Sequence, residues 1–194
     1  MTSRPYHHGD LKAALVAAGI DILEAHGIPG LSLRAIAARC GVSHSAPKNH
    51  FGSLRGLLTA IAAEGFRRHA AAMREGLGED ATPEARLAAA MQGYADFAQA
   101  SPALFQLMFS KLDCDFEDAA LKDAANASYA VLRGISTGLD WAMAGQPDSQ
   151  TRTEMMLWSL VHGYASLNNA GLFDKLPPHP IGYILPASTY RRPG

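Results

Sequence analysis

The sequence predicts an all-α protein of about nine helices, in which a small N-terminal head precedes a C-terminal helical bundle. Apolar residues recur at intervals of three and four over long stretches of the 194-residue chain, which is the period of an amphipathic helix. Glycine, serine and proline separate these stretches, and almost no segment alternates as a strand does. We place the head at residues 1–55, a connecting helix at 56–75, the bundle at 82–175 and an irregular, proline-rich tail at 176–194.

The first two helices of the head have clear start and stop signals. Asp10 is a suitable N-cap for the first helix, which should stop at Gly27. Ser32 is the expected N-cap of the second helix. Gly41 ends that helix, because glycine readily adopts the left-handed conformation that follows a last turn.

A third, short helix is expected from His44 to His50, with Ser43 as its N-cap. Pro47 would then be the fourth residue after the cap, where a helix makes its first backbone bond, so it should cost stability. Among residues 44–51 only Phe51 is large and apolar. The segment is therefore a short polar helix with a single anchor.

The fourth helix should begin after Ser53 and run from Leu54 to about Met73. We expect Gly56 and Gly65 to weaken it locally. Its later apolar positions should pack against the sixth helix, and they are Phe66, His69 and Met73.

The remaining elements follow one clear linker, GLGEDATPE at residues 76–84, in which Thr82 and Pro83 are the cap and the first residue of a helix. That fifth helix ends at residues 101–102. A short apolar helix at 101–112 and long helices at 117–144 and 149–172 complete the bundle. Five prolines exclude a helix in the last eighteen residues.

Composition limits the function. Charged residues make up 18% of the chain, so it is not a disordered polyelectrolyte, and its two cysteines form no metal-binding spacing or disulfide framework. No signal peptide and no run of about 18 apolar residues is present, so we expect a soluble, cytoplasmic protein that contacts no membrane. We expect no metal and no cofactor.

The net charge of −1 conceals an asymmetry between the two parts of the chain. Residues 1–75 hold nine basic and five acidic side chains, whereas the rest holds eight basic and thirteen acidic. Six of the eight histidines also lie in residues 1–75. A basic head on an acidic body indicates a polyanionic partner for the head.

The second and third helices, joined by a tight turn at Gly41, have the form of a helix-turn-helix. In that motif the second helix enters the major groove of DNA and the first crosses the backbone. A recognition helix is polar outward because base edges and phosphates offer donors and acceptors. His44, Ser45, Lys48 and Asn49 supply such chemistry.

The same residues resemble the DNA-binding domain of TetR-family transcriptional regulators. The resemblance combines a first helix ending in HG, then GLSL and AIA, then GVS, and then HF followed by LL at fixed spacing. Farther along, SPALFQLMFS and LWSLVHGYASL resemble the WHG-type C-terminal domain of one TetR branch through Trp158, His162 and Gly163. Together these resemblances cover roughly residues 6–173. They imply a homodimeric repressor with a ligand-responsive helical body.

Two departures favour an alternative. Family members commonly have a tyrosine where this chain has Lys48 and a lysine where it has Leu54, and both family residues typically touch phosphate. The alternative is an interaction protein that keeps the fold but binds operator DNA weakly. An enzyme is the least favoured class, because no nucleophile, carboxylate pair or metal-ligand set has a catalytic spacing, so we assign no catalytic residue.

The leading hypothesis is a repressor that is released from a palindromic operator by a small apolar or aromatic effector. Its candidate DNA-binding residues are Lys12, Ser32, Arg34, Ser43, His44, Ser45, Lys48, Asn49, His50 and Arg55. Aromatic and methionine linings are typical of adaptable small-molecule sites, and buried Tyr or His groups need polar partners. The candidate effector-binding residues are therefore Met91, Tyr94, Phe97, Phe105, Met108, Phe109, Trp158 and His162.

Overall fold

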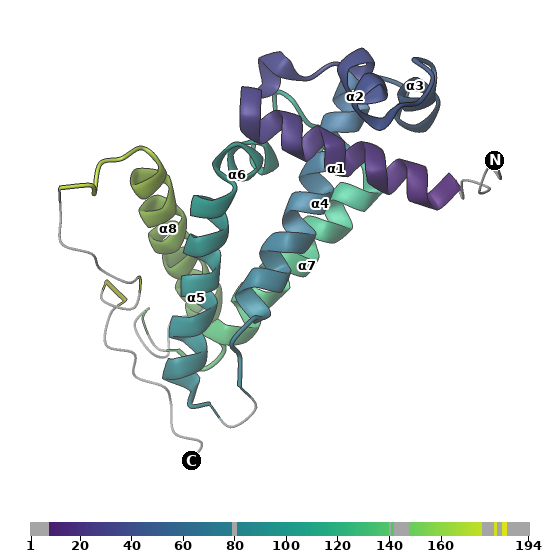
Figure 1. Cartoon of the computed structure of the whole chain (residues 1–194). Coiled ribbons are helices and arrows are strands. Elements are labelled where there is room, and N and C mark those ends of the chain that lie inside the picture. The colour runs from purple at the N-terminus through teal and green to yellow at the C-terminus, as the bar shows by residue number, and fades with distance from the viewer. Residues whose placement is uncertain are drawn as a thin grey trace. The chain divides into compact units, whose positions relative to one another are not determined.

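The structure is a computed structural model that describes residues 8–78, 81–139, 141, 148–175, 181 and 184–185, with side chains from residue 11 onward. In this part of the chain all regular structure is helical, with eight α-helices and one short 3-10 helix, so the predicted all-α class is confirmed (Figure 1). None of the described helices is long and apolar enough to cross a bilayer. The elements are α1 (His8–His26), η1 (Ile28–Gly30), α2 (Leu33–Cys40), α3 (Ala46–Phe51), α4 (Leu54–Arg74), α5 (Pro83–Ala100), α6 (Pro102–Met108), α7 (Ala119–Ser136) and α8 (Ser149–Asn169).

The chain divides into two compact units. The first unit is Met1–Phe66 with Ser101–Ala125, and the second is Arg67–Ala100 with Asn126–Gly194. Helices α4 and α7 each contribute residues to both units. The domain boundaries expected from the sequence, at residues 55, 75–82 and 175, are not the boundaries of these two units. They remain a prediction.

The core of the first unit is built where α1, α2 and α4 meet. Leu15, Ile36 and Ile61, one from each helix, are fully buried. At Gly19 of α1 an added Cβ would lie 2.6 Å from Cδ1 of Ile61, so the missing side chain lets the two helices approach closely. Burying such aliphatic side chains contributes about 1.5 to 3 kcal/mol each to folding.

The two glycines of α4 permit close contacts, a role beyond the local weakening of the helix, which remains a prediction. An added Cβ at Gly65 would lie 2.7 Å from Cγ and Sδ of Met108 on α6. One at Gly56 would lie 2.1 Å from the carbonyl oxygen of Phe51 at the end of α3. The glycines therefore allow α6 and the end of α3 to pack directly on the backbone of α4.

The predicted caps of α2 and α4 are confirmed. Ser32 Oγ accepts a hydrogen bond of 3.0 Å from the Ala35 amide, and Gly41 is left-handed with φ 65°. Ser53 Oγ likewise accepts from the Gly56 amide at 3.1 Å. These signals depend on local chain geometry, which is why the sequence reveals them.

The start of α3 differs from the prediction. The helix begins at Ala46 rather than His44, and Ser45 rather than Ser43 occupies the N-cap position. Pro47 is consequently the second helical residue, where its missing N–H is one of the groups that have no helical partner in any case. The expectation that Pro47 lowers the stability of this helix is therefore wrong.

Other helix ends differ as well. Helix α1 begins at His8, so Asp10 lies in its first turn instead of capping it; an acidic residue is favoured at both places. Helix α7 covers only Ala119–Ser136 of the expected 117–144, and the left-handed Gly138 follows its end. Helices α6 and α8 are also shorter than expected: α6 ends at Met108 instead of residue 112, and α8 ends at Asn169 instead of residue 172. The tail, 176–194, falls mostly outside the described residues.

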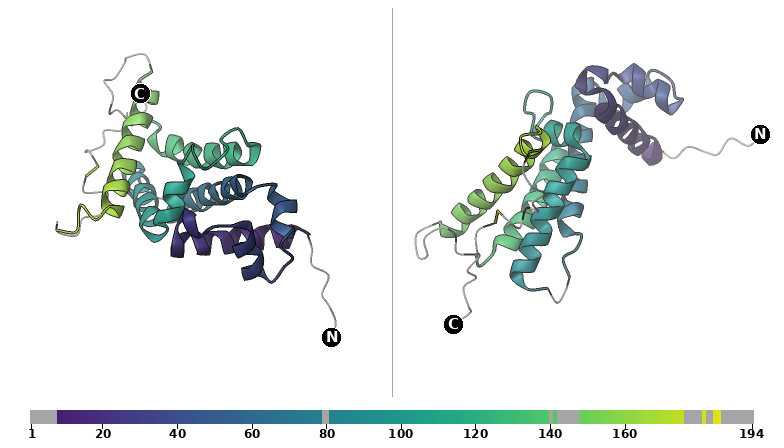
Figure 2. Two further views of the ribbon diagram at one scale, coloured as in Figure 1. Left: turned by 90° about the horizontal axis from the view of Figure 1, so that it is seen from above. Right: turned by 60° about the vertical axis from the view of Figure 1, so that its left-hand side comes forward.

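In the second unit α5 and α8 lie side by side, as Figures 1 and 2 show, and they form the most extensive helix pair of the unit. Leu87 and Met91 of α5 and Leu157 and Val161 of α8 are buried. At Gly93 an added Cβ would lie 2.1 Å from the Ala72 carbonyl oxygen, so α5 also packs against the last turns of α4.

Candidate functional site

The ten candidate DNA-binding residues all belong to the first unit. Nine are exposed and His50 is half-buried. The exposed ones are Lys12, Ser32, Arg34, Ser43, His44, Ser45, Lys48, Asn49 and Arg55. This exposure is what contact with DNA requires, but it does not test the contact itself.

Helix α3 and the turn before it present a polar surface. His44, Lys48 and Asn49 are exposed, whereas Pro47 of α3 is buried. Two candidates are already engaged by neighbours, since the hydroxyl groups of Ser43 and Ser45 share a hydrogen bond of 3.1 Å.

Lys12 connects α1 to the end of α3. Its Nζ lies 5.9 Å from the centre of the Phe51 ring, close enough for an attraction between the cation and the ring. The charge of Lys12 is thereby held beside the polar surface of α3. The exposed ion pair of Arg39 and Asp21, at 2.8 Å, joins α2 to α1 and contributes at most about 1 kcal/mol to stability.

Arg55 has a structural partner that the sequence did not reveal. Its Nη2 donates a hydrogen bond of 3.0 Å to the Cys114 carbonyl oxygen in the segment after α6. One turn along α4, Thr59 Oγ1 accepts a bond of 2.9 Å from the Asp115 amide. Arg55 therefore fastens this segment to α4, and its contact with DNA remains a prediction that uses its other N–H groups.

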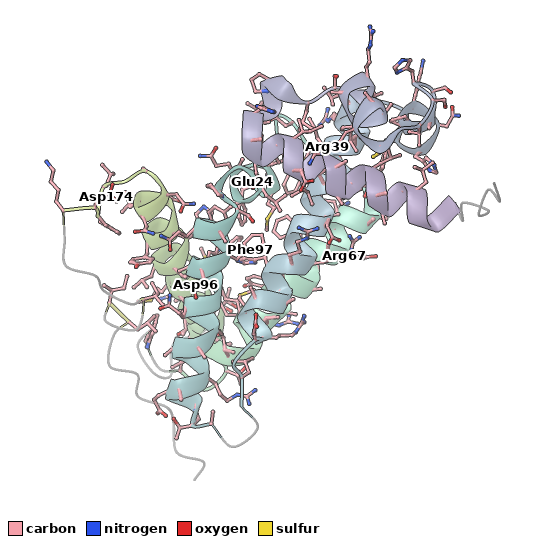
Figure 3. The ribbon with its side chains drawn as sticks, in the orientation of Figure 1. Glu24, Arg39, Arg67, Asp96, Phe97 and Asp174 are labelled. Carbon is pink, nitrogen blue, oxygen red and sulfur yellow. The ribbon has the colours of Figure 1, made fainter. Side chains whose placement is uncertain are left out.

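Glu24 of α1 caps α6 from a distant part of the sequence (Figure 3). Its carboxylate oxygens accept hydrogen bonds from the amides of Leu104 at 2.8 Å and Ala103 at 3.3 Å. Within the described structure the side chain of Ser101, at the N-cap position, makes no capping bond. Glu24 thus satisfies first-turn N–H groups that a local cap would otherwise satisfy.

Replacing Glu24 by Ala should lower the free energy of unfolding by about 1 to 3 kcal/mol, because two part-buried amides lose a charged acceptor. Thermal melts and amide hydrogen exchange at Ala103 and Leu104 measure this. Glu75→Ala, which removes an exposed carboxylate after α4, is the matched control. Unchanged exchange at Leu104 in the Glu24→Ala protein would contradict the capping role.

The eight candidate effector-binding residues fall into two groups. Phe105, Met108 and Phe109 belong to the first unit, where the rings of Phe105 and Phe109 lie 5.3 Å apart. The ring of Phe66 lies 5.4 Å from that of Phe109. Met91, Tyr94, Phe97, Trp158 and His162 belong to the second unit.

Within the second unit a polar cluster joins four helices. Tyr94 Oη of α5 and His162 Nδ1 of α8 are 2.9 Å apart, within hydrogen-bond distance. His69 Nδ1 of α4 is 2.8 Å from Ser128 Oγ of α7. The His69 ring lies edge-on to Tyr94 at 4.2 Å and to Phe97, labelled in Figure 3, at 5.2 Å. The structure therefore brings Tyr94, Phe97 and His162 together around His69.

The cluster is electrically neutral near pH 7. Burial, followed by the electrostatic effect of His162, lowers the pKa of His69 to about 3. Burial also lowers the pKa of His162. Burial raises the pKa of Tyr94, which a hydrogen bond with Trp158 partly opposes. Both imidazoles and the phenol are therefore uncharged.

Trp158 lies at the outer edge of this cluster. It is 40% exposed, and its ring lies 5.7 Å from that of Tyr129 on α7. The Tyr129 hydroxyl donates a bond of 2.6 Å to the carboxylate of Glu154, which also accepts one from Gln150 at 3.1 Å. Met91, in contrast, is fully buried on α5.

Sequence reasoning missed His69 and Ser128 as members of the cluster. His69 was expected to pack against the sixth helix, which remains a prediction, whereas its contacts with α5 and α7 were not foreseen. One signal was present, because His69 follows Phe66 by three residues and so shares its apolar face. Ser128 had no such signal, since serine is common on exposed helix surfaces.

Comparison with known proteins is consistent with these observations. Residues 15–61 match the family model of bacterial regulatory proteins of the tetR family. Residues 87–182 match the model of the tetracyclin repressor-like C-terminal domain. No match was found among curated proteins.

Several solved structures are similar over most of the chain. A protein of unknown function from Rhodococcus sp. RHA1 is 32% identical, with a TM-score of 0.75 over 93% of this chain and 92% of that one. A transcriptional regulator from the same organism is 22% identical, with a TM-score of 0.61 over 89% and 90% of the two chains. The TetR-like regulator LfrR from Mycobacterium smegmatis, in complex with proflavine, is 19% identical, with a TM-score of 0.59 over 89% and 90%. The last two show similarity of fold alone.

Proposed function

Because the chain belongs to the TetR family of transcriptional regulators, we propose that it is a repressor that binds a palindromic operator as a homodimer and is released by a small apolar or aromatic effector. Members of this family are DNA-binding regulators rather than enzymes. The observation that carries the DNA-binding part is the exposed polar surface of α3, where Lys48 and Asn49 point outward above the buried Pro47.

A mobility-shift assay with the DNA upstream of the protein's own gene tests operator binding. The protein should retard this fragment at nanomolar to micromolar concentration and release it in competition with the unlabelled fragment but not with random DNA. Equal competition by both would favour the alternative, a protein that keeps the fold but recognises its operator weakly, as Lys48 and the half-buried Leu54 suggested.

The role assigned to Lys48 is contact with a phosphate. If a dimer neutralises about six phosphates, the logarithm of the binding constant should fall with the logarithm of salt concentration with a slope near −5. Lys48→Ala removes two of these contacts per dimer, so the slope should become shallower by about 2 while sequence preference is kept. Lys111→Ala, at another exposed lysine of the first unit, is the control. An altered sequence preference at an unchanged slope would refute the phosphate role.

We propose that two chains associate through α7 and α8. Among the described atoms nothing lies within 4 Å of a Cβ added at Gly134 or Gly163. Small residues beside Gly134 on α7, Ala127 and Ala130, are exposed, and Met155 of α8 is 60% exposed. Small residues with open space above them let a second pair of helices approach closely, and a two-fold arrangement places two recognition helices on one palindrome.

Gly134→Trp should convert the dimer to a monomer without loss of helix content, because the indole fills the space that the second chain would occupy. Sedimentation equilibrium at micromolar concentration measures the change, and circular dichroism checks the fold. Ala85→Trp, at an exposed position of α5, should leave the dimer intact. Dimerisation of Gly134→Trp with wild-type affinity would place the interface elsewhere.

The effector acts by differential affinity, because a ligand that binds two states equally shifts neither population. A coupling of about 1 to 3 kcal/mol suffices for roughly 5- to 150-fold weaker operator binding. LfrR was solved with proflavine bound. For this chain we propose the binding of a small molecule, but not of proflavine itself.

A further inference from the structure

The polar cluster of the second unit carries an inference about the chemical class of the effector, and this inference rests on the proposed function. The cluster runs from the buried interior to the surface. Ser128, His69 and Tyr94 are all less than 5% exposed, His162 is half-buried, and Trp158 at the outer end is 40% exposed. Four helices therefore contribute polar groups to one cluster, whose exposure increases from Ser128 in the interior to Trp158 on α8.

The outer hydrogen bond of this cluster is the one that a ligand can exchange. Tyr94 Oη and His162 Nδ1, 2.9 Å apart, join α5 to α8. A hydroxyl group both donates and accepts, so one ligand hydroxyl can bridge Tyr94 and His162 whichever tautomer the imidazole adopts. A carbonyl oxygen can only accept hydrogen bonds. It could therefore bond to both Tyr94 and His162 only if the phenol and the imidazole Nδ1 each donated one.

Among the described residues, Tyr94 and His162 themselves offer a ligand hydrogen bonds rather than an opposite charge. Both groups are neutral near pH 7, as described above. The carboxylate of Glu154 lies two turns before His162 on α8, about 12 Å along the helix axis, and already accepts bonds from Tyr129 and Gln150. The neighbours of His69 in sequence, Arg67 and Arg68, are exposed. Transfer of a charged group from water to this position is therefore costly.

We propose that the effector is an uncharged aromatic alcohol whose hydroxyl inserts between Tyr94 and His162. An aromatic ligand suits the surroundings, because Tyr94 and Phe97 already form edge-to-face ring contacts there and Trp158, 40% exposed, offers a further ring to pack against. The hydroxyl replaces one internal hydrogen bond by two, which keeps both protein groups satisfied in the bound state.

A set of four probes with one ring system tests this class. These are 2-naphthol, naphthalene, 2-naphthoate and 2-naphthylmethylammonium, and their binding to the full-length protein is measured by tryptophan fluorescence and calorimetry at pH 7. We expect 2-naphthol to bind about tenfold more tightly than naphthalene, which lacks the hydroxyl, and at least tenfold more tightly than either ion. Equal or tighter binding of an ion, or no preference for the hydroxyl, would overturn the proposal.

Two variants test whether the preference for 2-naphthol over naphthalene arises at Tyr94. Tyr94→Phe should reduce the advantage of 2-naphthol over naphthalene to less than threefold while naphthalene binding changes little. Tyr164→Phe removes a hydroxyl elsewhere on α8 and should keep the full advantage. A thermal melt of each variant verifies that it is folded. An unchanged advantage in Tyr94→Phe would remove this site from the proposal.

Operator binding, measured on the same preparations, separates this inference from the proposed function. Failure of 2-naphthol to bind a protein that still retards its operator would refute the effector class and leave the DNA-binding regulator intact. Binding of 2-naphthol by a protein that recognises no operator would refute the proposed function, and with it the description of this ligand as an effector.

Discussion

Replacing Met108 by Ala is expected to lower the free energy of unfolding by about 2 to 5 kcal/mol, because the side chain is fully buried and its removal leaves a cavity. Cγ and Sδ of Met108 fill the space above Gly65, where an added Cβ would come within 2.7 Å. For a chain of this length the melting temperature should fall by about 4 to 20 °C. Calorimetry or a thermal melt measures the change.

Leu112→Ala is the matched control, since Leu112 follows α6 in the same unit and is 92% exposed. Its effect should stay within about 0.5 kcal/mol. The comparison also tests the assignment of Met108 to the effector site. A variant that keeps its melting temperature but loses the response to an effector would support that assignment, whereas a large loss of stability identifies Met108 as part of the core of the first unit.

Local signals in the sequence predicted much of the fold. The caps at Ser32 and Ser53 and the left-handed Gly41 were predicted because each depends on a few neighbouring residues. The position of α3 was missed for a related reason. Ser43 and Ser45 are both suitable N-caps by residue type, and in the structure α3 begins after Ser45 with Pro47 buried.

Contacts between segments that are distant in the chain could not be predicted from the sequence. Glu24 caps a helix about eighty residues away, and Arg55 bonds to a carbonyl 59 residues away. Neither side chain differs in type from a solvated surface residue, so a pattern could not identify its partner. The same limit explains why Arg55 was predicted only as a DNA contact, a role that remains a prediction beside its observed hydrogen bond.

His69 shows how much of a site can lie outside residue patterns. Tyr94 and His162 were predicted to be polar members of a site because they interrupt apolar helix faces. The residue at the centre of their cluster was assigned to another contact. Its environment depends on the convergence of α4, α5 and α7, which is a property of the tertiary packing.

The buried state of His69 leads to the second large effect, a loss of stability in acid. The pKa of His69 in the folded protein is about 3, whereas an unfolded chain has the ordinary value near 6.5. Above pH 6.5 the imidazole is neutral in both states and its titration contributes nothing. Between pH 6.5 and 3 the unfolded state takes up a proton that the folded state does not, so the free energy of unfolding falls as the pH falls.

The contribution of His69 should approach about 1.4 kcal/mol per pH unit below 6.5, or roughly 2 to 3 kcal/mol at pH 4.5. Urea unfolding of the wild type and of His69→Asn, measured from pH 7.5 to 4.5, isolates the contribution of His69. Asparagine keeps a polar group for Ser128 but does not titrate. The variant should be less stable at pH 7.5 and lose less stability on acidification. His44→Asn, at an exposed histidine before α3, should keep the wild-type dependence. If His69→Asn and the wild type lost stability in parallel, the folded protein would have to accept a proton at His69, and the neutrality of the cluster that selects an uncharged ligand would be lost with it.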